Sequence, residues 1–273
     1  MRRVRVIPSL LIKEGGLVKS VKFGKYTYVG DPINAVKIFN DKEVDELILL
    51  DISATVEHRK PDVSFIRQIA SEAFMPVGYG GGVTTADEVQ QLVNSGVEKV
   101  ILNTIAFDNP AIVTEGARRV GSQSVVVSVD VKKNFWGKHM VFTRNGTFNT
   151  KQGPATYAQQ MESAGAGELI LTSIDRDGTF TGYDNELVHQ VSSKVAIPVV
   201  ANGGASTVSD FYGAITKGAS AVAAGSMFVF QGPHRAVLIS YPTQQVLKNE
   251  LFNLIRSWFL LKTTLSFNGV LLL

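Results

Sequence analysis

The sequence contains no cysteine, and this absence excludes several kinds of chemistry. Without thiols the chain cannot form disulfides, use a thiolate nucleophile or build a zinc–sulfur site, and it suits a reducing cytoplasm. The four histidines are not spaced as metal ligands usually are, so we expect surface or packing residues. They are His58, His139, His189 and His234. We therefore expect a cytoplasmic protein that uses no metal and no other cofactor.

Strong charge and long apolar runs are also missing. The formal net charge is +3 over 273 residues, and no Lys/Arg stripe is interleaved with aromatic residues, so we expect no nucleic-acid partner. The N-terminal segment MRRVRVIPSLLIK is basic and then apolar, but the apolar run is short and no cleavage site of small residues follows. It predicts a first strand rather than a signal peptide. The apolar segment after about Lys248 is interrupted by Arg256 and Lys262, which argues against a membrane span.

The chain does contain a regular alternation of apolar runs and helical patterns. The runs that predict strands lie at 4–12, 47–52, 76–79, 100–103, 125–129, 169–172, 198–201 and 222–224. The helical patterns lie at 33–44, 63–73, 86–94, 110–120, 157–164, 186–193 and 209–217. Such alternation predicts parallel βαβ units, and eight strands favour a closed (βα)8 TIM barrel over an open sheet.

The chain also repeats itself. ELILL at position 46 is echoed by ELILT at position 168, and KVILNT at 99 is matched more loosely by AVAAGS at 221, so the offset is 122 residues in both cases. The first apolar run matches the fifth at an offset of 119 residues, which aligns Leu11 with Asp130. The barrel, residues 1–246, is therefore expected to consist of two (βα)4 halves, about 1–120 and 121–246.

Two segments break this rhythm. Residues 134–150 alternate around Asn145-Gly146 and predict a β-hairpin inserted after the fifth strand. Residues 247–273 form a C-terminal tail, for which we expect a helix that covers the bottom of the barrel. An interfacial or unfolded tail is the alternative.

In a (βα)8 barrel the active site lies at the C-terminal ends of the strands. Two Gly-Gly pairs occur at equivalent strand ends, and backbone N–H groups of such turns can approach an anion closely. We call Gly81, Gly82, Asn103 and Thr104 the first cradle, and Gly203, Gly204, Gly225 and Ser226 the second cradle. They predict a substrate with a phosphate at each end; the alternative is tight turns that need no ligand. The other polar residues at these ends are Asp51, Asp130, Thr172, Asp175 and Asp177.

Asp130 is the best candidate for an acid or base, because it ends an apolar strand and would face the mouth on a rigid element. A structural carboxylate that caps a loop, or pairs with Lys19 or Lys132, is the alternative. The first half has no such acid, because the repeat aligns Asp130 with Leu11. Asp175 and Asp177 could belong only to a turn, since Asp-Gly is common in turns.

A second charged set stands at the starts of the strands. It consists of Arg5, Glu46, Lys99 and Glu168. Two basic and two acidic side chains at one rim could form a ring of ion pairs across the barrel bottom. Solvated strand starts, or a ring that serves stability alone, are the alternatives.

Seven stretches together resemble the cyclase subunit of imidazole glycerol phosphate synthase, over residues 1 to about 235. They are GDPINAVKIFNDKEVDELILLDISAT, GYGGGV, VEKVILNTIAF, GSQSVVVSVD, GELILTSIDRDGTFTGYD, ANGGAS and AAGSMFVF. The resemblance implies a lyase-type synthase subunit of a glutamine amidotransferase complex. In that family a glutaminase subunit docks on the barrel bottom, and ammonia passes up the barrel to a bisphosphorylated substrate at the top.

The resemblance also implies roles for single residues. Arg5, Glu46, Lys99 and Glu168 match the family's gate for ammonia. The phosphate-binding positions carry over to Gly82, Asn103, Thr104, Asp177, Gly178, Gly204, Gly225 and Ser226. Lys19, in the mobile loop after the first strand, matches as well.

One position departs from the family. Its cyclases use two aspartates as acid and base; Asp130 matches the second, but Leu11 stands at the first. Losing one positioned acid or base commonly costs on the order of 10²–10⁴-fold in rate. This form resembles a paralogous branch associated with glutamine-dependent amidation of sugars in surface-polysaccharide (lipopolysaccharide) pathways, beside a separate sugar amidotransferase.

Three functions follow as hypotheses. In the first, the chain receives ammonia from a glutaminase and serves sugar amidation. In the second, it is a working cyclase of histidine biosynthesis that makes imidazole glycerol phosphate and aminoimidazole carboxamide ribonucleotide, with Asp177 or water replacing the missing acid. In the third, the barrel is only a scaffold that activates the glutaminase.

Overall fold

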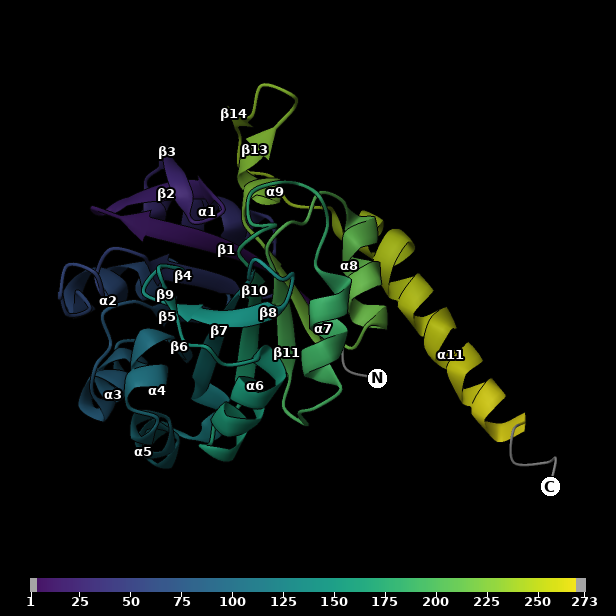
Figure 1. Cartoon of the computed structure of the whole chain (residues 1–273). Helices are drawn as coiled ribbons and strands as arrows, with labels where there is room; N and C mark the ends of the chain where they lie inside the picture. Colours follow the sequence, from purple (N-terminus) through teal and green to yellow (C-terminus); the bar gives the residue numbers. More distant parts are fainter. Residues whose placement is uncertain (1–3, 269–273) are drawn as a thin grey trace.

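The structure, a computed structural model, describes residues 4–268 and shows in this range a closed barrel of eight parallel strands (Figure 1). Around the barrel these are β1 (Arg5–Lys13), β4 (Leu47–Asp51), β5 (Val77–Gly80), β6 (Lys99–Leu102), β7 (Val125–Lys133), β10 (Glu168–Ser173), β11 (Val199–Asn202) and β12 (Ala221–Ala224). Parallel pairing of β12 with β1 closes the barrel, with Arg5 opposite Ala221. The predicted (βα)8 TIM barrel is confirmed.

Each predicted helical pattern forms a helix on the outside of the barrel. The helices are α1 (Pro32–Asp41), α2 (Val63–Glu72), α3 (Ala86–Asn94), α5 (Ala111–Val120), α6 (Pro154–Ser163), α7 (Asn185–Ser192) and α8 (Val208–Thr216). Their starts follow from local sequence. The Asp31 carboxylate accepts a hydrogen bond from the Asn34 backbone N–H at 2.8 Å, and Thr85 and Glu88 form a capping box at the start of α3.

The barrel strands divide their side chains between two cores, because successive residues point to opposite faces. One set packs outward against the helices. The other fills the barrel centre with a buried apolar layer of Ile7, Ile48, Ile101, Val126, Ile170, Val200, Ala221 and Ala223. This layer separates the charged residues at the strand starts from the polar residues at the strand ends.

An antiparallel hairpin follows the first strand of each half. In the second half, β7 pairs with β8 (His139–Thr143), which pairs with the short β9 (Phe148–Asn149). The hairpin predicted at 134–150 is therefore present, and it also extends β7. In the first half, β1 pairs with β2 (Gly16–Val21), which pairs with β3 (Gly24–Gly30). The sequence patterns predicted only a loop there.

Other short elements were also not predicted. The helices α4 (Thr104–Asp108) and α9 (Ser226–Val229) begin at the equivalent strand ends of the two halves. The small hairpin of β13 (Phe230–Gln231) and β14 (Ala236–Val237) follows α9.

The last described residues form one continuous helical segment. It comprises α10 (Gln244–Leu247), a π-helical turn η2 (Lys248–Phe252) and α11 (Asn253–Asn268). The predicted boundary at 246/247 falls inside α10, and Leu247, Leu251 and Ile255 are fully buried. The segment packs against α8, and α11 then runs away from the barrel, so the expected cap over the barrel bottom is not what the described residues form (Figure 1). Residues 269–273 of the predicted tail lie outside the described range.

Among the described residues, no helix is both long and apolar enough to cross a membrane.

Candidate active site

A cavity of about 750 Å³ opens at the C-terminal ends of the strands and is lined by both halves of the barrel. Most of the predicted site residues line it: Lys19, Asp51, Gly81, Gly82, Asn103, Thr104, Asp130, Thr172, Asp177 and Gly225. Gly178, Gly203, Gly204 and Ser226 do not line this cavity. All four residues of the first cradle therefore line the cavity, whereas only Gly225 of the second cradle does so.

Asp130 extends from β7 into the cavity and is only 8% exposed. Its carboxylate accepts hydrogen bonds from the Ser128 hydroxyl at 3.0 Å and the Asn103 side-chain amide at 3.1 Å. Burial raises the pKa of Asp130 to about 6, although these hydrogen bonds act in the opposite direction. A carboxyl group with such a pKa can take up and release protons near neutral pH.

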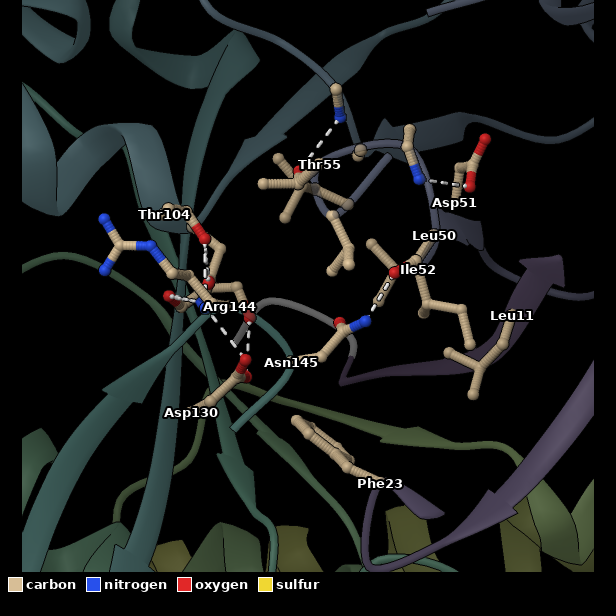
Figure 2. A pocket seen from close by; sticks show the side chains of 18 of the residues that line it. Leu11, Phe23, Leu50, Asp51, Ile52, Thr55, Thr104, Asp130, Arg144 and Asn145 are labelled. Carbon is tan, nitrogen blue, oxygen red and sulfur yellow. Dashed lines mark hydrogen bonds between the residues drawn. The ribbon is translucent and has the colours of Figure 1, made fainter. Parts of the chain in front are cut away.

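Leu11 lines the same cavity from β1. Figure 2 shows it beside Leu50, on the opposite side of the cavity from Asp130. Leu11 is the register partner of Leu50, so two apolar side chains stand where β1 and β4 reach the mouth. The end of β7 thus presents an acid to the cavity, whereas the end of β1 presents an apolar side chain.

The glycines of the first cradle are required by close backbone packing. Gly81 and Gly82 have positive φ angles of 123° and 72°. A Cβ on Gly81 would lie 2.3 Å from the Asp51 carbonyl oxygen, and one on Gly82 would lie 2.4 Å from the Arg59 carbonyl oxygen. The Gly82 N–H donates a long hydrogen bond of 3.3 Å to the Thr55 hydroxyl. Packing alone accounts for these glycines, so their role with phosphate remains a proposal.

The second cradle lies beneath the β2–β3 hairpin. Lys19 is on β2 rather than in the predicted mobile loop, is buried, and donates a hydrogen bond to the Ser9 carbonyl oxygen. Its Nζ lies 2.0 Å from the place that a Cβ on Gly225 would occupy. Burial lowers the pKa of Lys19 to about 8, and the nearby Asp177 carboxylate opposes this shift. A cation is therefore held directly at the end of β12.

Asp177 is itself held by the hairpin. The Ser20 hydroxyl donates to its carboxylate at 3.0 Å, and the Lys22 N–H donates to its carbonyl oxygen at 3.0 Å. Burial raises the pKa of Asp177, while Lys19 acts to lower it. Gly178 lies under the same hairpin, with the Ser20 carbonyl oxygen 2.2 Å from where its Cβ would be.

Several other predicted residues hold loops. Asp51 accepts hydrogen bonds of 3.0 Å from the backbone N–H groups of Ser53 and Ala54, so it shapes the turn after β4. Asp175 accepts a hydrogen bond from the Lys133 N–H at 2.8 Å, which ties the loop after β10 to the end of β7. The Thr172 hydroxyl accepts one from the Asn202 side-chain amide at 3.1 Å.

His139 is buried and contacts the Asp184 carboxylate at 3.1 Å, so this histidine is a packing residue. In the part of the chain that the structure describes, no group of three or more His, Asp or Glu residues could hold a metal ion.

The charged residues at the strand starts form a closed ring. Arg5 forms ion pairs with Glu46 and Glu168, and Lys99 contacts the same two carboxylates at 2.8 Å and 2.7 Å. The side chains of Glu46 and Glu168 are 3% and 7% exposed. Burial opposes the charge of Arg5, yet its hydrogen bonds to both carboxylates raise its pKa above the ordinary value. The ring therefore forms a closed set of ion pairs directly below the apolar layer.

Sequence reasoning missed several residues that line the cavity. They include Thr55, His58, Arg59, Arg144 and Asn145. The Asn145-Gly146 turn was recognised as a hairpin tip, but no local signal showed that this tip would reach the mouth of the barrel. There, the Asn145 side-chain amide donates to the Ile52 carbonyl oxygen.

Comparison with known proteins agrees with this architecture. A family profile described as "Histidine biosynthesis protein" matches residues 5–234. A protein of Pseudomonas aeruginosa, provisionally named imidazole glycerol phosphate synthase subunit hisF2, is 53% identical over 243 residues, or 89% of this chain and 97% of the relative. The provisionally named subunit hisF3 of Vibrio vulnificus is 47% identical over 253 residues, or 92% and 97%. The imidazole glycerol phosphate synthase subunit HisF of Natranaerobius thermophilus is 40% identical over 228 residues, or 83% and 90%.

The fold, the cavity at the strand ends and the family profile define the class, a (βα)8-barrel protein of the histidine biosynthesis type. Within this class, the chain belongs to the family of imidazole glycerol phosphate synthase subunit HisF.

Proposed function

We propose that this chain is a HisF-like subunit that receives ammonia from a glutaminase and serves the amidation of a surface-polysaccharide sugar. The observation that carries the proposal is Leu11. It lines the cavity at the position of β1 that the internal repeat matches with Asp130 of β7. Because a leucine cannot exchange a proton, ring closure with an acid and a base would lack one partner. Ammonia that reaches this cavity is then used by another enzyme.

The ring at the strand starts supports the entry of ammonia from the opposite end. Arg5, Glu46, Lys99 and Glu168 close the barrel bottom with alternating charges that satisfy one another. A glutaminase docked on this N-terminal face could open the ring by drawing one side chain, such as Lys99, toward itself. Ammonia would then meet the apolar layer that begins at Ile7.

The relatives support a paralogue rather than the housekeeping subunit. The two provisionally named and numbered relatives, hisF2 and hisF3, are 53% and 47% identical to this chain. The Natranaerobius thermophilus subunit HisF, named without reservation, is 40% identical. Numbered names fit second and third copies of a gene whose first copy keeps the original reaction.

The test is to purify the chain with its glutaminase partner and to measure two products in parallel. We expect glutamine-dependent transfer of nitrogen to a sugar when a sugar amidotransferase is added, and almost no imidazole glycerol phosphate from the bisphosphorylated substrate. Robust formation of imidazole glycerol phosphate by the unmodified chain would contradict the proposal.

A second candidate function is a working cyclase of histidine biosynthesis, and one observation favours it. Asp177 lines the same cavity as Asp130, has a raised pKa because of burial, and lies beside Lys19. Such a group could supply the second proton transfer. Growth of a histidine auxotroph that lacks its cyclase, after introduction of this chain, would decide for the second function. Loss of that growth in Asp177→Asn would identify the substitute acid.

A further inference from the structure

We propose that Arg144 is an anion-binding residue, which holds a phosphate group of the substrate at the Asn103–Thr104 end of the first cradle. It would be the counterpart of Lys19 at the second cradle. The inference rests on the phosphate cradles predicted from the sequence and adds a binding residue that the motifs did not indicate.

The first observation is that the two hairpins cross between the halves. The β2–β3 hairpin of the first half lies on the second half, where Ser20 donates to the Asp177 carboxylate at 3.0 Å. The tip between β8 and β9, which belongs to the second half, lies on the first half. There, the Arg144 N–H donates to the Thr104 hydroxyl at 3.1 Å. Each half therefore covers the strand ends of the other.

The second observation is that each hairpin brings a cationic residue to the end of the fourth strand of the other half. Lys19 lies at Gly225, the residue that follows the fourth strand of the second half. The backbone N–H of Arg144 contacts Thr104, which lies just after the fourth strand of the first half. The repeat aligns Thr104 with Ser226. The two cationic residues thus reach equivalent strand ends of the repeat, Lys19 with its ammonium group and Arg144 with its backbone N–H, although the hairpins that carry them differ in sequence and length.

The third observation concerns the guanidinium group of Arg144. It lies at the rim of the cavity, and its NH2 nitrogen donates to the Asp108 carboxylate at 3.0 and 3.2 Å. Asp108 is four residues after Thr104 on α4, so the two side chains are about one helical turn apart, roughly 5–6 Å between their Cβ atoms. The guanidinium is therefore held at the Asp108 end of α4, and binding a phosphate at Thr104 would require the side chain to turn from Asp108 toward Thr104.

The fourth observation is the donors that remain. The Nε and NH1 groups of Arg144 make no hydrogen bond to any residue that the structure describes. Arg59, the other arginine that lines the cavity, uses Nε for Glu57, NH1 for Asp51 and NH2 for the Ser53 hydroxyl. Arg144 alone of the two can offer a fork of donors to an oxyanion.

The side chain of Arg144 is also restrained before any ligand binds. Its Cζ lies 4.5 Å from the centre of the Phe148 ring, and Asp108 fixes its far end. A phosphate would compete with Asp108 for this guanidinium, which can pair with phosphate through two parallel hydrogen bonds. A phosphate monoester is therefore the ligand class that this site fits.

The competing explanation is that Arg144 only ties the hairpin to α4 through Asp108. Two matched variants separate the explanations, because both break the ion pair. Arg144→Gln removes the anion-binding group, whereas Asp108→Asn removes a carboxylate that would compete with phosphate for the guanidinium.

The experiment is a titration of the full chain with inorganic phosphate at neutral pH, followed through the backbone amide resonances of Gly82 and Thr104 for the first cradle and of Gly204 and Ser226 for the second. In Arg144→Gln we expect phosphate to bind the first cradle at least about tenfold more weakly, with the second unchanged within about twofold. In Asp108→Asn we expect binding at the first cradle to be unchanged or tighter. Arg144→Lys, which keeps the charge, should lose less than Arg144→Gln.

Three results would overturn the proposal: equal weakening in Arg144→Gln and Asp108→Asn, no weakening in Arg144→Gln, or no phosphate-dependent change at Gly82 and Thr104 in the unmodified chain. The titration requires neither glutaminase nor turnover. Its failure would leave the ammonia function untouched, and a failure of ammonia transfer would leave phosphate binding untouched.

Discussion

The strands β1 and β7 occupy equivalent places in the two half-barrels, and each continues into an antiparallel hairpin. They differ at one position of the mouth, where β1 presents Leu11 and β7 presents Asp130. At the starts of the strands, by contrast, the first half contributes more charged residues than the second. The first half contributes Arg5, Glu46 and Lys99 to the charged ring, and the second contributes only Glu168.

The two halves of the repeated fold therefore carry different functional groups. The first half carries most of the charge at the bottom, where the proposed ammonia entry lies. The second half carries the only aspartate of the equivalent pair at the top. Three substitutions and one comparison of the two hairpins test this division.

Leu11→Asp should have the largest effect, because it restores the equivalence of the two strand ends. A second carboxylate opposite Asp130 should raise formation of imidazole glycerol phosphate by about 10²–10⁴-fold. The measurement is turnover of the bisphosphorylated substrate with ammonium salt as the nitrogen source. Leu11→Asn is the matched control of similar size without an acid. Equal activity of the two variants would show that the missing acid is not what limits the chain.

Lys99→Met should have the next largest effect, on stability. It leaves the nearly buried carboxylates of Glu46 and Glu168 with Arg5 as their only cation in the ring. Breaking a buried ion pair from one side commonly costs about 3 kcal/mol. Urea denaturation measures the free energy of unfolding, and Lys99→Arg, which keeps the charge, should lose much less. An unchanged midpoint in Lys99→Met would mean that the ring contributes nothing to the fold.

Asp130→Asn should stabilise the protein above pH 6. The folded-state pKa of Asp130 is raised to about 6 by burial, so the fold favours the protonated carboxyl group. The stability that the protonated carboxyl group contributes is therefore fully present below the unfolded-state pKa of about 3.9 and is lost as the pH rises through 6. At pH 8 the variant should be more stable by up to about 3 kcal/mol, and near pH 3.5 the difference should vanish. Leu11→Asn should show no such pH dependence.

The smallest effect is expected at the β8 hairpin. The hydrogen bond between His139 and Asp184 raises the pKa of His139, while burial opposes the shift. The stability that the protonated histidine contributes is therefore fully present below about pH 6.5 and is lost as the pH rises through the higher folded-state pKa. Hydrogen exchange of the β8 amides should accelerate above that range, by an amount that corresponds to about 1 kcal/mol or less. Below the pKa of Lys19, which is about 8, the β2–β3 hairpin, held by Ser20 and Asp177 instead, should not respond. Equal acceleration in both hairpins would contradict this assignment.

The fold could be predicted because its signals are local. Runs such as 125–129 are apolar and β-branched, and the repeated ELIL motif fixes which strands are equivalent. Asp130 and the cradles followed from the rule that barrel sites lie at strand ends. The ring could be proposed because its four charges stand at strand starts.

What could not be predicted depends on contacts between distant residues. Ser20 and Asp177 are 157 positions apart, and neither sequence segment shows that a hairpin will join them. Arg144 was unremarkable in the sequence, because its place at the first cradle depends on how the hairpin folds back. The burial of Leu247, Leu251 and Ile255 was missed for a similar reason, since α8 supplies the contacts.

The crossed hairpins carry a consequence for the order in which ligands bind. A phosphate bound at the second cradle would act on a hairpin that begins in β1, and one bound at the first cradle would act on a hairpin that begins in β7. If either hairpin tightens when its cradle is filled, the strand that supplies it is restrained in the other half as well. The two ends of a bisphosphorylated substrate would then be thermodynamically linked, so that the second phosphate binds more tightly than the first.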